Sequence, residues 1–173
     1  RETQCWPGLR ADERLPHART LLRGGYELML QGLYHLAEER LLPDEELLRV
    51  CRKRLELEAL VWDDTPPAAS WGAARLHFQM AAAYARLGGY ETMAEQLALT
   101  AEHARAFDTR APQTAVSSLL LGEHIRDRAD FETADTRPLC EIVRDKWLAD
   151  PSFDAVRATP AFREVRAALS RGA

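Results

Sequence analysis

Two arginines and a glutamine fall on one side of a predicted helix, at a spacing that could form a binding surface. Arg75, Gln79, Ala82 and Arg86 are four, three and four residues apart, which places them in a single helical stripe. A guanidinium group can hold a peptide carboxylate through two parallel hydrogen bonds. The small residues around Ala82 would leave room for a ligand backbone, and Phe78 lies beside the stripe. These five residues are the candidate ligand groove; alternatively, the stripe is a solvated helix face.

Metal binding and catalysis have little support in the sequence. Ser117 and Ser118 lie outside any G-x-S-x-G elbow of the kind that exposes a nucleophilic serine. Four histidines have polar neighbours, but no H-x-x-x-H or H-E-x-x-H spacing occurs among them: His35, His77, His103 and His124. We therefore expect no metal, no cofactor and no enzymatic activity.

Charge and cysteine usage narrow the class of protein further. A net charge of -4 and a pI near 5.8 provide no basic surplus with which to bind nucleic acid or an anionic membrane. No apolar run approaches the length of a membrane span, and no charged-then-apolar leader opens the chain. The three cysteines, Cys5, Cys51 and Cys140, lie outside any C-x-x-C motif. A cytoplasmic protein without membrane contact fits these features.

Composition and apolar periodicity predict an all-α chain. Alanine and leucine (28 and 25 residues) far outnumber valine and isoleucine (6 and 2), and unbranched side chains favour helices. Residues 1–16 show no clear period and read as an N-terminal tail or truncated linker. Glycine and proline breaks divide residues 17–173 into eight expected helices, at about 17–23, 28–42, 44–62, 71–87, 90–107, 114–128, 138–148 and the end of 150–169.

One short segment occurs twice in the chain. RGGYELM at Arg23–Met29 returns as LGGYETM at Leu87–Met93, and residues 24–38 share eight identities in fifteen with residues 88–102. Glycine can adopt the left-handed conformation that ends a helix, so each Gly-Gly pair is expected to end one and to let the chain turn back. We therefore predict two stacked helical elbows, with Tyr26 and Tyr90 buried between neighbouring helices.

The second copy, YARLGGYETMAEQLALTAEHA, resembles a tetratricopeptide hairpin. The positions of the pattern W-x-x-L-G-x-x-Y…A-x-x-x-F are occupied here by His77, Met80, Ala81, Tyr84, Met93 and Leu97. Residues 23–38 look like the second half of an earlier repeat. For residues 17–173 the resemblance implies antiparallel helical hairpins stacked in a right-handed α-α superhelix.

The C-terminal half sharpens this resemblance. It is similar to the tetratricopeptide domains that follow a helix-turn-helix in bacterial XRE-type transcriptional regulators, where the last hairpin leads into A-x-x-Y-D-T-x-P…T-S-x-L and closes on F-D-x-x-R-x-x-P-x-F. The likeness covers roughly residues 17–170. The matching residues are Ala104, Phe107, Asp108, Thr109, Ser117, Ser118, Leu119, Phe153, Asp154, Arg157, Pro160 and Phe162.

The resemblance implies a sensor and dimerisation domain that binds a peptide or protein segment. DNA would be reached only through a domain upstream of Arg1, because no helix-turn-helix pattern lies within the chain. Regulators of this type bind two-fold symmetric sites, so a homodimer is expected. The alternative is a free-standing tetratricopeptide scaffold that mediates protein-protein interaction without DNA binding, and a helix-turn-helix upstream would decide between the two.

Overall fold

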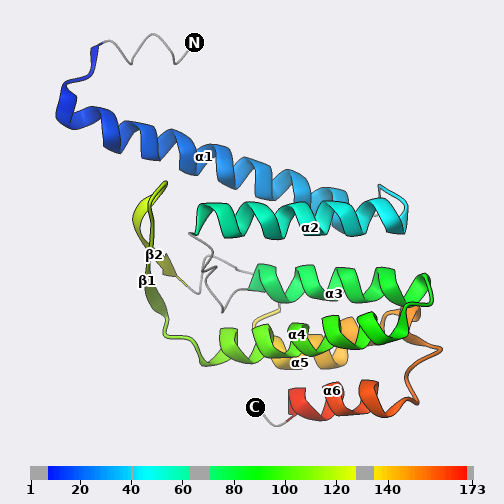
Figure 1. Ribbon diagram of the computed structural model, residues 1–173. Helices are drawn as coiled ribbons and strands as arrows, with labels where there is room; N and C mark the ends of the chain where they lie inside the picture. The colour runs from blue at the N-terminus through cyan, green and yellow to red at the C-terminus, as the bar shows by residue number, and fades with distance from the viewer. Residues whose placement is uncertain (1–7, 40, 63–70, 128–134, 171–173) are drawn as a thin grey trace.

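The computed structural model describes residues 8–39, 41–62, 71–127 and 135–170, and this part of the chain is mainly helical (Figure 1). Helices α1 (Ala11–Glu38) and α2 (Asp44–Val61) form one antiparallel pair, and α3 (Trp71–Arg86) and α4 (Tyr90–Thr109) form the next. The shorter helices α5 (Leu139–Asp145) and α6 (Pro160–Ser170) pack on α4 and on each other. The all-α prediction is confirmed in this coarse sense. No helix among the described residues is both long and apolar enough to cross a membrane.

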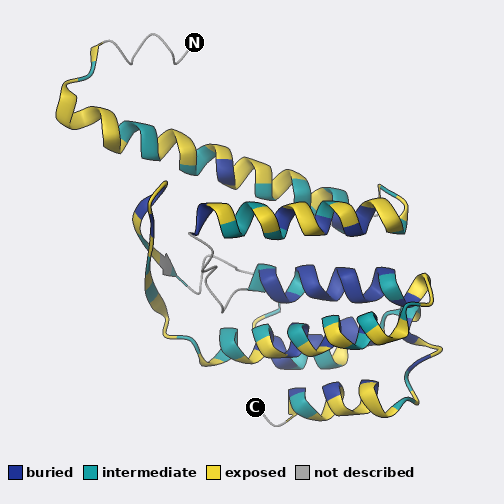
Figure 2. Ribbon diagram, viewed as in Figure 1, coloured by how far each residue is buried: buried dark blue, intermediate teal, exposed yellow. Residues whose placement is uncertain are grey.

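Helix α3 is the centre of the stack, with α2 on one side and α4 on the other (Figure 1). It is buried along most of its length (Figure 2). Ala74, Ala81 and Ala83 are fully buried, and their small side chains allow the neighbouring helices to approach closely. The largest core cluster extends from α3 and α4 to α5 and α6 and includes Leu97 and Phe153.

The elbow predicted at Gly88-Gly89 is present between α3 and α4. Gly88 has a φ of +77°, in the left-handed region that favours glycine. The Gly89 N–H donates to the Tyr84 carbonyl at 2.9 Å and the Gly88 N–H to the Ala85 carbonyl at 3.2 Å. This pair of hydrogen bonds is the Schellman closure of a helix, and it turns the chain back into α4.

The elbow predicted at Gly24-Gly25 is wrong, because α1 continues through both glycines. Positive φ among the described glycines occurs at Gly88 and Gly122, and neither Gly24 nor Gly25 has it. A glycine in the interior of a helix costs only about 1 kcal/mol, which tertiary contacts can offset. The tertiary contact that offsets this cost is the one between Tyr26 and Trp62.

The N-terminal boundary also differs from the prediction. Helix α1 starts at Ala11, inside the segment expected to be a tail.

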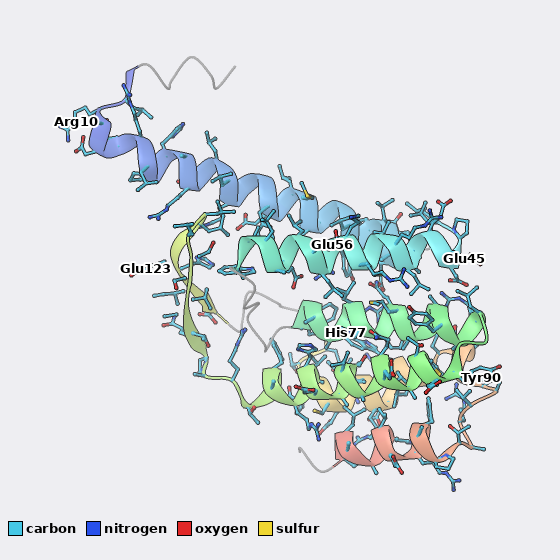
Figure 3. All side chains as sticks on the ribbon, in the orientation of Figure 1. Arg10, Glu45, Glu56, His77, Tyr90 and Glu123 are labelled. Atoms are coloured by element: carbon cyan, nitrogen blue, oxygen red, sulfur yellow. The ribbon has the colours of Figure 1, made fainter. Side chains whose placement is uncertain are left out.

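The two tyrosines of the repeated segment differ in environment. Tyr26 is 8% exposed, and its ring meets Trp62 edge-on, with 6.3 Å between the centroids. The Trp62 Nε1–H donates to the Tyr26 hydroxyl at 3.0 Å. The predicted burial of Tyr26 is therefore confirmed. Tyr90 is 49% exposed, so its predicted burial is wrong. As the first residue of α4 it directly follows the α3–α4 turn, at the end where the two helices are joined, as Figure 3 shows.

A β-hairpin replaces the helix expected at 114–128. Strands β1 (Gln113–Ser118) and β2 (Gly122–Asp127) pair antiparallel, with Ser118 opposite Gly122. Gly122 has a φ of +75° directly after the three-residue loop 119–121, a usual place for a left-handed glycine in a hairpin. Leu121 in that loop is buried against Tyr26, Val61 and Trp62, so the tip of the hairpin belongs to the α1–α2 core.

The C-terminal elements lie near their expected positions. Helix α5 is followed by two short 3-10 turns, η4 (Trp147–Ala149) and η5 (Pro151–Phe153), which together cover most of the segment expected at 138–148 and the turn expected after it. Helix α6 begins at Pro160, a residue whose fixed φ suits the first turn of a helix. Residues of η4, with Asp150 after it, form one wall of the candidate site.

The first prediction concerns the contact that anchors α1. Tyr26→Phe removes the hydroxyl that accepts the Trp62 N–H, and we expect it to lower the free energy of unfolding by about 1–3 kcal/mol. Urea unfolding followed by circular dichroism measures the change. Tyr90→Phe, at the exposed copy of the same motif, is the matched control and should change the value by less than about 0.5 kcal/mol. Equal effects at the two positions would contradict the structure.

Candidate functional site

The five residues predicted as a ligand groove line one depression of about 180 Å³. They come from successive turns of α3, as their spacing indicated. The facing wall is formed by the end of α1, the start of α2 and the turn before η5: Ala37, Glu38, Leu47 and Asp150.

A second hollow, of about 350 Å³, adjoins the first and shares Arg75, Phe78 and Asp150 with it. Its remaining lining residues, Lys146, Trp147 and Ala149, belong to η4 and the residue before it. We refer to the two hollows together as the α3 groove. The larger hollow falls within the roughly 300–1,000 Å³ range of ligand pockets.

Arg75 is held by groups of the chain itself. Its Nε donates to Glu38 Oε2 at 3.0 Å, and its Nη2 donates to Glu38 Oε1. The guanidinium carbon lies 4.9 Å from the ring centroid of Phe78 and 4.7 Å from that of Trp147, within the range of cation–π attraction. Only 16% of the Arg75 side chain is exposed. Arg75 therefore joins the end of α1 to α3 and η4.

Arg86, at the exposed end of the stripe, is also paired. Its Nε and Nη2 donate to the Asp44 carboxylate, with Nε 2.9 Å from Oδ2, and its Nη1 donates to Ser152 Oγ at 2.9 Å. Since Asp44 begins α2 and Ser152 lies in η5, Arg86 bridges the two walls of the groove. Both arginines thus bind carboxylates of the chain.

Gln79 lies between the two arginines and has one group without a partner. Its Nε2 donates to Glu38 Oε2 at 2.7 Å, which fixes the orientation of the amide. Its Oε1 is buried and accepts no hydrogen bond, and the residue is 6% exposed. A buried acceptor without a donor costs roughly 1–3 kcal/mol. Among the described residues that line the groove, Gln79 thus contributes a buried side-chain acceptor that has no hydrogen-bond donor.

Several features of the groove had no signal in the sequence. Glu38 and Asp44 neutralise the arginines from other helices, and Trp147 forms a wall from a segment about seventy residues away along the chain. Pairing across helices depends on how the helices pack, which periodicity does not report. The sequence offered only a weak indication of these ion pairs: one acidic residue, Glu38, near the end of a predicted helix and another, Asp44, at the start of the next.

The residues that carry the family resemblance have structural roles next to the groove. The Asp108 carboxylate accepts hydrogen bonds from the backbone N–H groups of Leu139 and Cys140, at 2.7 and 2.9 Å, and so caps α5. Arg157 donates to the carbonyl oxygens of residues 148, 149 and 150. Phe153 is fully buried. These residues hold η4 and η5 in place, and with them the Trp147 wall.

The histidines do not form a metal site among the described residues, where no group of three or more metal-ligating side chains occurs. His77 stacks on His103 with 5.2 Å between ring centroids and 6° between planes. Its Nδ1 lies 2.8 Å from Gln96 Oε1 on α4, and Figure 3 shows it between the two helices. Burial lowers the pKa of His77 below its usual value. The neutral ring therefore serves packing between α3 and α4.

Two cysteines are buried thiols. Burial raises the pKa of Cys51 to about 11 and that of Cys140 to about 12, so neither is a thiolate near neutral pH. Both are free of disulfides. Cys5 lies outside the described residues. The described thiols contribute apolar packing rather than nucleophiles.

Comparisons of the chain with protein-family models, with curated proteins and with solved structures find no match. The geometry of the α3 groove is therefore the main basis for a functional proposal.

The contacts of Arg75 lead to a prediction that differs from the one its sequence suggested. A solvated arginine could be removed without loss, but Arg75→Ala leaves the Glu38 carboxylate without its guanidinium and opens a gap beside Trp147. We expect a loss of roughly 1–3 kcal/mol in the free energy of unfolding. Arg49→Ala, at an exposed arginine on α2, is the control and should stay within about 0.5 kcal/mol. If the two variants unfold alike in urea, the Arg75 contacts are not formed.

A third prediction follows from the burial of His77. Because its pKa is lowered in the folded chain, the unfolded chain binds this proton at higher pH, and stability falls as the pH drops below about 6.5. We expect the melting temperature to fall between about pH 7.5 and 5.5, and to fall less steeply in His77→Gln. Tyr90→Phe, which removes no histidine, is the control and should keep the wild-type slope. A slope unchanged in His77→Gln would show that His77 does not titrate as expected.

Proposed function

We propose that the chain is the ligand-binding domain of a bacterial transcriptional regulator, and that the α3 groove takes a short peptide segment. The observation that carries this proposal is the buried, unpartnered Oε1 of Gln79 within a groove bordered by three parts of the chain. Native structures rarely leave a buried acceptor without a donor. A ligand that donates a hydrogen bond to Gln79 Oε1 would therefore bind more tightly.

The chemistry of the groove favours a peptide in an extended conformation. Such a peptide presents backbone N–H groups that can donate to Gln79 Oε1, whereas the N–H groups inside a helix are already used. The neighbouring Phe78 and Trp147 rings offer an apolar surface for one side chain of the ligand. Ala82, which is 4% exposed, adds no bulk in the first hollow. The α3 groove thus combines one specific polar contact with apolar surroundings, as ligand sites commonly do.

Charge alone does not select the ligand. The cationic groups of the groove, Arg75, Arg86 and Lys146, are matched in number by the anionic groups Glu38, Asp44 and Asp150. Since both arginines already bind carboxylates of the chain, a ligand carboxylate would have to compete with Glu38 or Asp44. In this proposal Gln79, rather than either arginine, recognises the ligand.

The wider setting rests on the family resemblance. In this proposal the helical pairs belong to a right-handed tetratricopeptide-type superhelix, the protein acts in the cytoplasm as a homodimer, and DNA is bound by a domain upstream of these residues. Arg75 and Arg86 connect the α1–α2 pair to η4 and η5 across the groove. A ligand bound between the α1–α2 pair and η4–η5 would stabilise one relative position of these two walls. This requires that it bind the two positions with different affinity.

A peptide titration tests the proposal. We expect a subset of a short-peptide library to quench or shift tryptophan fluorescence on binding, because Trp147 borders the groove. Gln79→Met keeps the approximate shape of the side chain but removes the acceptor, together with the Nε2 donor to Glu38, which still binds Arg75. It should weaken the binding of those peptides about tenfold, the value of one hydrogen bond. Gln31→Met, at an exposed glutamine on α1, is the matched control and should bind like wild type.

Two results would count against the proposal. Absence of binding by every peptide in the library would remove the peptide as the ligand. Equal affinities in wild type and Gln79→Met would remove Gln79 from recognition, even if binding occurs elsewhere on the domain.

A further inference from the structure

Helix α1 exposes an unusually apolar face. Leu21, Leu22, Leu28 and Met29 are 44%, 49%, 70% and 53% exposed, and they lie within nine consecutive residues of one helix. Large contiguous apolar patches are uncommon on monomeric proteins and usually mark an interface. Figure 2 shows α1 along the outer edge of the stack, largely exposed. Nothing in the described chain covers this face.

The apolar face points away from the domain to which α1 belongs. At 100° per residue, Tyr26 and Leu30 lie on the side of α1 that packs on Trp62 and the hairpin tip. Leu22 and Met29 form one edge of the exposed face, and Leu21 and Leu28 form the other. Ala18, Gly25 and Gly32 run at seven-residue intervals between these two edges. The face is therefore a shallow channel with an apolar ridge on each side.

No contact among the described residues requires a glycine at positions 24, 25 or 32 of α1. A Cβ added at Gly24, Gly25 or Gly32 would meet no atom within 4 Å, and none of the three has a positive φ. Each glycine in a helix interior costs roughly 0.5–1 kcal/mol relative to alanine. Close approach of another backbone is the physical use for glycine that remains, and it needs a partner outside the described fold.

We propose that this face binds a second copy of the chain, with the two α1 helices antiparallel. If the two-fold axis passes at the level of residues 26 and 27, two large side chains of each copy meet glycines of the other copy. Leu28 then faces the partner's Gly25, and Leu21 faces the partner's Gly32. The face is thus complementary to itself, which a two-fold symmetric dimer requires.

The charges at the two ends of the channel also favour the antiparallel arrangement. Arg14 lies at the N-terminal end of the channel and Glu39 at its C-terminal end, and both are exposed. In the antiparallel register above, Arg14 faces the partner's Glu39 at both ends of the interface. A parallel pair would instead bring like charges together at each end. The helix has 28 residues, about 42 Å, so the contact is long enough for a helical dimer.

This inference rests on α1 alone and not on the α3 groove or its ligand. It does, however, give a surface to the homodimer that the family resemblance implies. Helix α1 contributes Ala37 and Glu38, at its C-terminal end, to the lining of the groove, so a substitution at Gly25 leaves the groove residues in place.

Analytical ultracentrifugation over a wide concentration range tests the interface. We expect wild type to dimerise reversibly. Gly25→Leu fills the channel and should raise the dissociation constant about tenfold or more, while the melting temperature of the monomer does not fall, because leucine favours helix over glycine. Thr20→Leu, which adds the same side chain at an exposed position off the channel, is the control and should dimerise like wild type.

Charge reversal tests the register independently of folding. Arg14→Glu and Glu39→Arg should each weaken the dimer, and the double variant should restore it, because the opposite charges then face each other again. A wild type that stays monomeric at every concentration would overturn the inference. A dimer unaffected by Gly25→Leu, or one not restored by the double reversal, would overturn the proposed face and register. Peptide binding by the α3 groove should persist in Gly25→Leu, so the two proposals can fail separately.

Discussion

The fold depends on how Arg75 is buried. A guanidinium group 16% exposed on the central helix requires a carboxylate, and Glu38 at the end of α1 supplies it. The Phe78 and Trp147 rings on either side complete its surroundings. These three contacts come from three separate parts of the chain, so satisfying one cation fixes the α1–α2 pair and η4 relative to α3. The groove is the space that this arrangement leaves beside Gln79.

The repeated Gly-Gly-Tyr-Glu segment shows where local sequence stops determining structure. At Gly88 the chain takes a positive φ and turns back, whereas at Gly24 the same residues continue as helix. The difference lies outside the repeat. Tyr26, in the middle of α1, meets Trp62 at the end of α2, whereas Tyr90 is the exposed first residue of α4, directly after the turn. A glycine pair permits a turn, and the tertiary contacts of the following residues decide whether the turn forms.

Helical periodicity predicted much of the rest. The bounds of α2, α3 and α4 follow closely from apolar spacing and from the proline and glycine breaks, because these helices are long and have a clear apolar side. The hairpin at Gln113–Asp127 was missed because its leucine-rich loop outweighed the β-branched Thr114 and Val116 in the strand. The same periodicity brought five groove residues together on α3. It could not show that Glu38 and Asp44 neutralise the arginines, because ion pairs between helices depend on packing.

The central claim is that the α3 groove binds a peptide beside Gln79, and the indole N–H signals of the tryptophans test it most directly. Trp147 borders the groove, while Trp62 is buried against Tyr26 in the α1–α2 core and serves as an internal reference. In a ¹H–¹⁵N spectrum recorded during titration with a binding peptide, the account predicts that the Trp147 signal shifts progressively and that the Trp62 signal stays in place. A Trp147 signal that does not move while the peptide binds, or equal shifts at both indoles, would contradict it.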